Sequence, residues 1–397
     1  FRTDGPAELR AELQGFGEAP GQAYWLSDWA LFMALKGRYG GAAFREWPEE
    51  LRRRQPGALA RAERELADEV AWHVFLQFLF FRQWDRVREA AHARGIRVLG
   101  DIPIYVSPDS ADVWSHPEIF ELDGAGDPVR VAGVPPDYFS ETGQLWGNPL
   151  YRWDVLERDG FHWWVERVRA NLRMTELLRL DHFRGFAGYW AVPAGAETAV
   201  DGAWVPGPGR KLFDALAREL GELDLVAEDL GEITPDVTAL VTDLDLPGMK
   251  ILQFAFGGND EDYQPHNHVP NGVVYTGTHD NDTTRGWWDK SDDGTRHRVL
   301  AYLGGDPNDP IGILVRAAYS SVSRLAIVPA QDVFGLGSEA RMNTPGQGAD
   351  NWGFRARKWE FNGERAGWLR ELAALTGRFR LPEEAKEDEN GANGNGG

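Results

Sequence analysis

The sequence predicts an α/β fold built on a barrel of parallel strands. Six short apolar segments alternate with helical segments, acidic residues follow three of them, and 397 residues suffice for a barrel domain. The predicted strands are 96–100, 177–180, 223–227, 249–254, 272–276 and 324–328. An eight-stranded barrel needs two more. Because residues 1–95 show helix and loop patterns, we expect the first two barrel strands to be missing.

Helical patterns dominate the first part of the chain. Ser27 is placed to cap a helix over 27–39, and a longer helical stretch covers about 57–93. We therefore expect residues 1–95 to form a helical subdomain together with the helix that leads into the barrel. Residues 96–380 should form the rest of the barrel.

The barrel region contains one long interruption. Residues 103–160 are rich in Pro, Gly, Asp and Trp without a sustained period, which predicts a loop insertion at the active site. Beyond it, helices are expected near 162–173, 209–220, 234–243, 311–321 and 365–375. Residues 381–397 are acidic and then rich in Gly and Asn, which predicts a disordered tail.

Composition excludes several classes of function. A net charge of −20 argues against nucleic acid as a partner. The chain has no cysteine, which excludes disulfides and thiolate metal sites, and we expect a cytoplasmic location. No apolar run is long enough to predict a membrane span. Because the chain begins with Phe1 and has no signal-peptide pattern, we expect a cut end there.

Three acidic residues stand where predicted strands end. Asp181, Glu228 and Asp280 are separated by 228 − 181 = 47 and 280 − 228 = 52 residues, which is one or two strand–helix units each time. A parallel barrel gathers the ends of its strands at one mouth, where catalytic groups of that fold lie. Three carboxylates around one pocket suit an oxocarbenium-like transition state. The sequence therefore predicts sugar transfer or hydrolysis.

Structural or metal-binding roles remain open for several of these residues. The cluster 279–282 contains possible metal ligands, but it lacks a recognised ligand pattern, so a metal-dependent hydrolase is the least favoured alternative. His182 and His279 are either core histidines or sugar ligands. Asp101 either contacts substrate or braces Arg179.

Several longer motifs accompany the carboxylates, in order, between about residues 24 and 378. They are Gly100–Val106, Asp109–Trp114, Val131–Ser140, Thr142–Pro149, Arg341–Asn343 and Asn351-Trp352. With these motifs the chain resembles the 4-α-glucanotransferases called amylomaltase or disproportionating enzyme, glycoside hydrolase family 77. The resemblance implies an amylase-type (β/α)8 barrel with inserted helical subdomains. It also implies transfer of α-1,4-glucan pieces to another sugar's 4-hydroxyl, with no metal or organic cofactor.

The resemblance assigns roles to individual residues. It implies that Asp181 is the nucleophile, Glu228 the general acid/base and Asp280 the stabiliser of the transition state. The implied sugar contacts are Asp101, Arg179, His182, His279, Asp137, Tyr138, Phe139, Gln144, Trp146 and Asn351. The implied partners are α-1,4-glucans and maltooligosaccharides as donors, with glucose or a maltooligosaccharide as acceptor.

One feature departs from the family. Its members begin with a segment that supplies the first two barrel strands, and nothing in this chain matches that segment, in agreement with the count of six. Two alternatives therefore stand beside the transferase. One is an amylase-type hydrolase of the same bonds, and the other is an inactive, truncated glucan-binding fragment.

The proposed chemistry sets requirements for these side chains. Arg179 precedes Asp181 by two strand residues, so both should face the same way, and a guanidinium lowers the pKa of a neighbouring carboxylate. Glu228 must hold a proton at neutral pH, which needs dry or negative surroundings. The aromatic residues of the loop 133–149 should exclude water in favour of an acceptor sugar.

Overall fold

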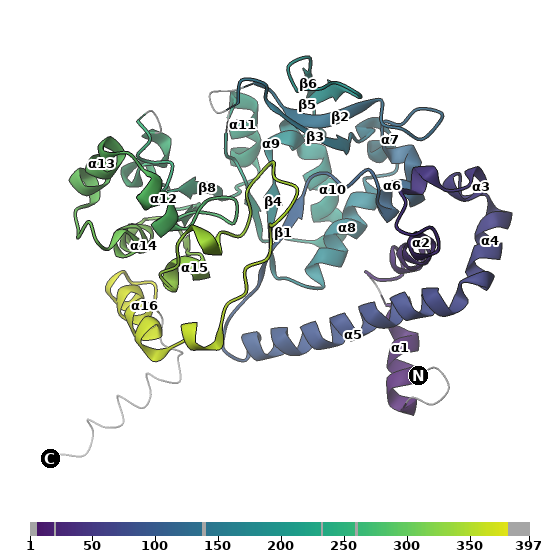
Figure 1. Cartoon of the computed structure of the whole chain (residues 1–397), viewed down its shortest axis with the longest axis horizontal. Helices are drawn as coiled ribbons and strands as arrows, with labels where there is room; N and C mark the ends of the chain where they lie inside the picture. Colours follow the sequence, from purple (N-terminus) through teal and green to yellow (C-terminus); the bar gives the residue numbers. More distant parts are fainter. Residues whose placement is uncertain (1–5, 20, 137–139, 232, 259–260, 380–397) are drawn as a thin grey trace. The chain divides into compact units, whose positions relative to one another are not determined.

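The computed structural model describes residues 6–19, 21–136, 140–231, 233–258 and 261–379. The chain divides into two compact units, Phe1–Leu246 and Pro247–Gly397, each with a three-stranded parallel sheet. Figure 1 labels most of their helices and strands. All six predicted barrel strands are present, whereas the described residues before position 99 contain helices and turns but no strand. The predicted tail, 381–397, lies outside the described residues.

The parallel sheet of the first unit has the order β1-β4-β7. Its strands are β1 Leu99–Pro103, β4 Leu177–Asp181 and β7 Leu225–Ala227. β1 begins three residues later than predicted, because the backbone N–H of Val98 is held by the Glu176 carboxylate at 2.8 Å. Asp101 is consequently the middle residue of β1, whereas the predicted strand 96–100 placed it directly after the strand's end.

Helices make up the described residues that precede β1. They are α1 Ala7–Glu18, α2 Leu26–Arg38, α3 Glu49–Arg52, α4 Pro56–Glu65 and α5 Ala67–His92. The prediction that Ser27 caps α2 is wrong, because the turn before it runs directly into the helix and Leu26 N–H already bonds to Gln22 O. The predicted stretch 57–93 is two helices, since Leu66 leaves helical geometry and buries its side chain.

The segment 103–160, which the sequence predicts as a loop insertion, contains regular secondary structure. The segment holds α6 Ala111–Ser115, β2 Arg130–Val134, β3 Gln144–Pro149 and α7 Trp153–Arg158. β2 and β3 join β5 Gly188–Pro193 and β6 Ala203–Pro206 in an antiparallel sheet of order β3-β2-β5-β6 (Figure 1). Because β2 pairs with a strand almost sixty residues away, no local periodicity indicates this sheet.

Helices between and after these strands agree with the predicted alternation. In the first unit they are α8 His162–Leu172, α9 Arg184–Ala187, α10 Arg210–Leu220 and α11 Pro235–Asp243. α8 and α10 lie side by side (Figure 1) and belong with β1 and β4 to one large apolar core. Fully buried side chains such as Trp164, Leu178 and Phe186 form part of its centre.

The second unit has its own parallel sheet of order β10-β9-β8. The strands are β8 Gly248–Ile251, β9 Gly272–Tyr275 and β10 Leu325–Ile327. Its helices are α12 Thr284–Lys290, α13 Asp293–Leu303, α14 Pro310–Ser320, α15 Ala330–Val333 and α16 Gly363–Leu375. Among the described residues, no helix is both long enough and apolar enough to cross a bilayer.

Candidate active site

Strand register places four polar residues of the first unit on one face of its parallel sheet. Asp101 of β1 is paired with Arg179 of β4, and Arg179 is paired with Val226 of β7. Residues two apart on a strand face the same way, so Asp181 shares the face of Arg179 and Glu228 shares the face of Val226. The ladder continues beyond β7, since Glu228 N–H donates to Leu180 O at 3.1 Å.

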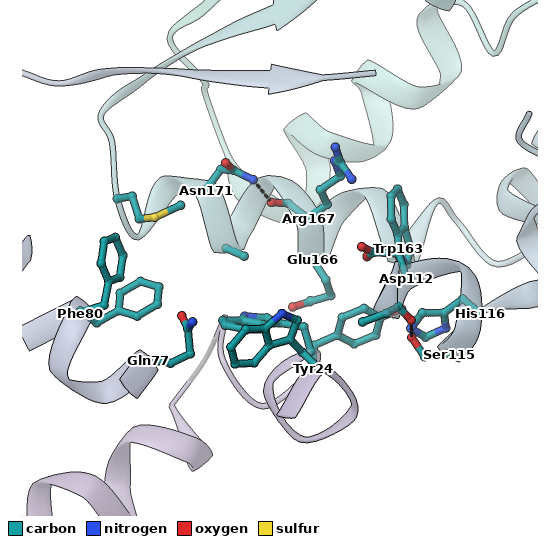
Figure 2. A pocket seen from close by; sticks show the side chains of 16 residues that line it. Tyr24, Gln77, Phe80, Asp112, Ser115, His116, Trp163, Glu166, Arg167 and Asn171 are labelled. Carbon is teal, nitrogen blue, oxygen red and sulfur yellow. Dashed lines mark hydrogen bonds between the residues drawn. The ribbon is translucent and has the colours of Figure 1, made fainter. Parts of the chain in front are cut away.

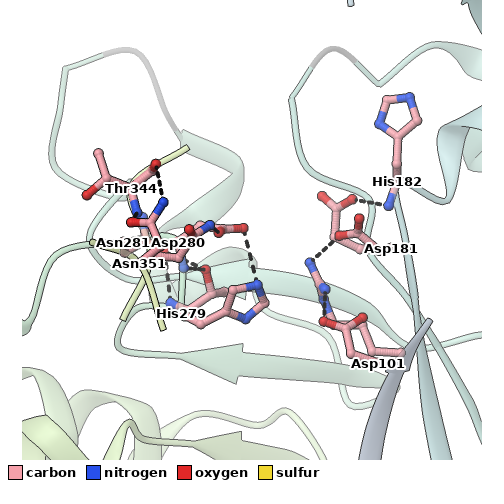
Figure 3. A network of polar contacts seen from close by, with 12 residues as sticks. Asp101, Asp181, His182, His279, Asp280, Asn281, Thr344 and Asn351 are labelled. Carbon is pink, nitrogen blue, oxygen red and sulfur yellow. Dashed lines mark hydrogen bonds and ion pairs between the residues drawn. The ribbon is translucent and has the colours of Figure 1, made fainter. Parts of the chain in front are cut away.

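Arg179 lies at the centre of this face and is buried, with 7% of its surface exposed. One terminal nitrogen, Nη1, donates to Asp101 Oδ2 at 2.6 Å, and the other, Nη2, lies 3.0 Å from Asp181 Oδ1. The guanidinium therefore bridges the carboxylates of Asp101 and Asp181, both of which are labelled in Figure 3. Asp101 therefore fixes the side chain that orients Asp181, whose own carboxylate is 38% exposed and so open to a substrate.

The Glu228 carboxyl is held by backbone donors. Its Oε2 accepts from the N–H of His182 at 2.6 Å, and its Oε1 accepts from the N–H of Leu230 at 3.1 Å. His182 directly follows Asp181, so this contact brings the Glu228 carboxyl against the backbone beside Asp181. Both oxygens are thus fixed by backbone N–H groups.

The surroundings of Glu228 raise its pKa to about 8. Burial is the main cause, because it disfavours the charged form, and the negative charge of Asp181 adds to it. Arg179 and the two backbone N–H groups act in the opposite direction. Glu228 is therefore largely protonated at neutral pH, as a general acid must be.

His182 turns the chain sharply after β4. Its φ of 51° lies in the left-handed region, which is uncommon for a non-glycine residue and is typical of functional sites. Burial, followed by the charge of Arg184, lowers the pKa of the imidazole to about 3. The ring is therefore neutral at physiological pH and presents one donor and one acceptor nitrogen.

An aromatic side chain from the antiparallel sheet reaches the same place. The Trp146 ring meets the His182 ring edge to face, with centroids 4.6 Å apart, and Trp146 Nε1 donates to Gln144 Oε1 at 3.1 Å. Gln144 and Trp146 belong to β3, and both are exposed. The other aromatic and acidic residues predicted in this region, Asp137, Tyr138 and Phe139, lie outside the described residues.

In the second unit, Asp280 follows β9 and is fixed by a separate network (Figure 3). Asn343 Nδ2 donates to Asp280 Oδ1 at 2.6 Å, and His279 Nε2 lies 3.4 Å from Asp280 Oδ2. Arg341 donates to the backbone oxygens of Asp280 at 2.6 Å and of Asn343 at 2.8 Å. The carboxylate is thus held in one orientation by neighbours from the segment 341–343.

Asn351 is a structural part of this network. Its Oδ1 accepts from the N–H of Thr344 at 2.9 Å, and its Nδ2 donates to Gln347 O at 2.8 Å. The bonds close the turn before Trp352, whose ring packs against that of His279 with centroids 5.2 Å apart. Trp352 is 61% exposed and presents an apolar surface beside His279.

The segment that carries His279 and Asp280 is anchored at both ends by one buried carboxylate. Asp332 is 1% exposed and accepts from Thr276 Oγ1 at 2.8 Å and from the N–H and Oγ1 of Thr284 at 2.7 Å each. Thr276 follows β9, and Thr284 begins α12. Asp332 therefore fixes the distance that residues 277–283 span.

The described residues contain no group of three or more His, Cys, Asp or Glu side chains arranged to hold a metal ion.

Comparisons with known proteins agree with one another. Residues 1–360 match the family model Glyco_hydro_77, described as 4-alpha-glucanotransferase. The chain belongs to this family.

Individual relatives support the assignment. A 4-alpha-glucanotransferase of Thermus thermophilus is 50% identical over 388 residues, which cover 96% of this chain and 77% of the relative. One from Synechocystis sp. is 49% identical over 383 residues, covering 95% and 75%. The solved structure of amylomaltase from Streptococcus agalactiae in complex with acarbose has a TM-score of 0.90 and 37% identity, covering 94% of this chain and 76% of that one. The fold is therefore the family's amylase-type barrel fold.

The predicted site residues fall into two groups in this family member. Asp101, Arg179, Asp181, His182, Glu228, Gln144 and Trp146 lie in the first unit, and His279, Asp280 and Asn351 lie in the second. The candidate list omitted Asn343 and Arg341, which orient Asp280, and Trp352. Their motifs were visible in the sequence, but a contact across more than sixty residues has no local signal.

The pKa of Glu228 makes stability depend on pH. In the unfolded chain Glu228 loses its proton near the ordinary pKa of a glutamate, whereas in the folded chain it keeps the proton up to about pH 8. Between these two pH values the folded state binds more protons than the unfolded state. The free energy of unfolding therefore falls as the pH rises. In Glu228→Gln this decline disappears. Between pH 5 and pH 9 we expect the variant to gain about 2–4 kcal/mol relative to wild type, after allowance for partial solvent contact.

Urea unfolding at both pH values measures this difference, and any constant effect of the amide cancels between them. Glu219→Gln, at an exposed position of α10, is the control and should retain the wild-type decline. Parallel curves for wild type and Glu228→Gln would show that the carboxyl is ionised throughout.

Proposed function

We propose that this family member transfers α-1,4-glucan segments between sugars by a retaining double displacement, with Asp181 as nucleophile and Glu228 as general acid and base. The observation that carries this proposal is the pairing of a guanidinium-bound, partly exposed Asp181 with a buried, protonated Glu228. A retaining reaction at an anomeric carbon needs these two protonation states side by side.

In the first half-reaction, Asp181 attacks the anomeric carbon, and Glu228 gives its proton to the departing 4-oxygen. The bond from the anomeric carbon to that oxygen breaks, a glucosyl ester of Asp181 forms, and the released sugar leaves with the proton. Arg179 keeps Asp181 ionised before the attack, because its Nη2 binds the attacking carboxylate directly.

In the second half-reaction, the charge state of the pair reverses. Esterification neutralises Asp181 and so removes one of the two causes that raise the pKa of Glu228. Glu228, now deprotonated, accepts the proton of an acceptor's 4-hydroxyl, whose oxygen displaces Asp181. Two inversions restore the α configuration, and Glu228 regains its proton.

We assign Asp280 to transition-state stabilisation. Its support is a position five residues after the parallel strand β9, family membership, and a carboxylate that Asn343 and His279 hold in place. A fixed negative charge stabilises an oxocarbenium-like centre because it needs no reorganisation during the reaction.

Sugar contacts and cellular context complete the proposal. Asp101, Arg179, His182, Gln144, Trp146, His279 and Asn351 are proposed to contact or position the glucan, together with Asp137, Tyr138 and Phe139. Donors are α-1,4-glucans and maltooligosaccharides, and acceptors are glucose or a maltooligosaccharide. We also propose a cytoplasmic location, since a chain without cysteine gains no disulfide in an oxidising compartment.

Products from maltotriose test the reaction type. Transfer should yield glucose together with a ladder of maltooligosaccharides longer than maltotriose, as measured by anion-exchange chromatography. Hydrolysis would yield only shorter sugars and would establish the amylase-type alternative. An unchanged substrate would support the non-catalytic, glucan-binding alternative.

Azide rescue tests the two roles separately. With α-maltosyl fluoride as donor, the leaving group needs no proton, so Glu228→Ala should still form the ester, and azide should release α-maltosyl azide. In Asp181→Ala, azide should replace the nucleophile and give the β-azide. We expect maltotriose turnover to fall at least about a thousandfold in both variants. Anomeric proton couplings distinguish the products, and the same anomer from both would refute the assignment.

Trp146 is expected to favour transfer over hydrolysis. Its ring covers the imidazole of His182, the residue that directly follows Asp181, so Trp146→Gly should admit water to the ester. We expect the ratio of transfer to hydrolysis to fall about 3- to 10-fold, measured as longer sugars formed per new reducing end. Trp204→Gly, at an exposed position of β6, is the control. An unchanged ratio in Trp146→Gly would contradict this role.

A further inference from the structure

A cavity of about 290 Å³ opens among helices of the first unit, apart from the carboxylates described above (Figure 2). Its lining comes from the segments 24–29, 77–81, 111–116 and 163–174, which belong to α2 and the turn before it, α5, α6 with the following residue, and α8 with the turn after it. We propose that this cavity is a second binding site for α-1,4-linked glucose chains. The choice of ligand rests on the proposed function.

Aromatic faces form much of the lining. The indoles of Trp25 and Trp29 meet at 72° with centroids 5.9 Å apart, so they present surfaces in two directions. Phe80, 45% exposed, and the buried Trp163 lie on opposite sides of the cavity (Figure 2). Rings of this kind bury the C–H faces of a pyranose while its hydroxyls remain at the edge.

Polar groups with unused hydrogen-bonding capacity lie among these rings. Within the part of the chain that the structure describes, the side chains of Asp112 and Gln77 have no hydrogen-bond partner. Glu166 points into the cavity (Figure 2). Among the described residues, only its Oε1 accepts a hydrogen bond, from Arg169 Nε at 3.2 Å. Burial and nearby carboxylates raise the pKa of Tyr24, which keeps its hydroxyl protonated as a donor. The lining therefore offers mainly acceptors, together with amide and hydroxyl donors.

The charge of the lining favours a neutral polyol over an anion. Asp112 and Glu166 bring negative charge, whereas the guanidinium of Arg167 lies over the Trp163 ring at 5.1 Å and donates to Pro103 O at 2.8 Å. A phosphate or carboxylate ligand would be repelled by Asp112 and Glu166, and the cations Arg167 and Arg169 offset that repulsion only in part. Sugar hydroxyls, in contrast, donate to carboxylates, and their ring carbons pack on indoles.

Occupation of this cavity should matter for long glucans only. Maltotriose is consumed at the carboxylates and needs no second contact, whereas a long chain can occupy both places at once. A variant of the cavity should therefore raise the KM for amylose and leave kcat and KM for maltotriose unchanged. This pattern separates the second site from the reaction, since failure of the proposed function would abolish turnover of both substrates.

The test uses Gln77→Met and Asp112→Asn, alone and combined, in the full chain. Gln83→Met, at an exposed position of the same helix α5 and outside the cavity, is the matched control. Each lost hydroxyl contact should weaken amylose binding about 3- to 10-fold, measured by retardation in native gels containing amylose in a Glu228→Gln background. The control should bind as the parent does.

Hydrogen exchange of the parent supplies a measurement that needs no cavity variant. Maltoheptaose should protect amides in 24–29 and 111–116 in addition to those around 181–183. Protection confined to the carboxylate site, or equal retardation of the cavity variants and Gln83→Met, would overturn the proposal. So would displacement of amylose by tetramethylammonium, which would identify the cavity as an aromatic site for organic cations.

Discussion

The first unit's active-site face depends on the ion pairs of one buried residue. Arg179 needs two carboxylates because a guanidinium that is almost fully removed from water is costly unless it is paired and hydrogen-bonded. Parallel pairing of β1 with β4 supplies Asp101 at the same level, and the strand period supplies Asp181. The carboxylate of Asp181, which we propose as the nucleophile, is thus oriented by the same register that holds the sheet together.

The fold places Asp181 and Glu228 so that the charge of Asp181 affects the pKa of Glu228. Burial alone would raise the pKa of any carboxyl at position 228, but only the charge on Asp181 makes that pKa respond to the reaction. Arg179 pairs with the Asp181 carboxylate at 3.0 Å, and its positive charge also acts against the raised pKa of Glu228. In the proposed mechanism, Glu228 can therefore act as acid and then as base without a change of conformation.

Sequence patterns predicted the elements whose signals are local. All six parallel strands and the helices α8, α10, α11, α14 and α16 have apolar periods of their own, and the strand-end carboxylates follow from them. The antiparallel sheet depends on pairing between β2 and β5, and the hold of Asn343 on Asp280 depends on chain closure across more than sixty residues. The start of β1 depends on a single bond from Glu176. None of these has a local period.

Transfer competes with hydrolysis, because water is present at high concentration. Exclusion of water at Trp146 therefore meets only one requirement of transfer. The other requirement is a supply of sugar ends that carry a free 4-hydroxyl. A glucan held in the cavity among α2, α5, α6 and α8 belongs to the same unit as Asp181, and tethering gives its ends an effective concentration on the order of millimolar. That supply persists when free acceptor is scarce. The aromatic cavity and the neutral His182–Trp146 pair would then act together, one on the acceptor and one on water.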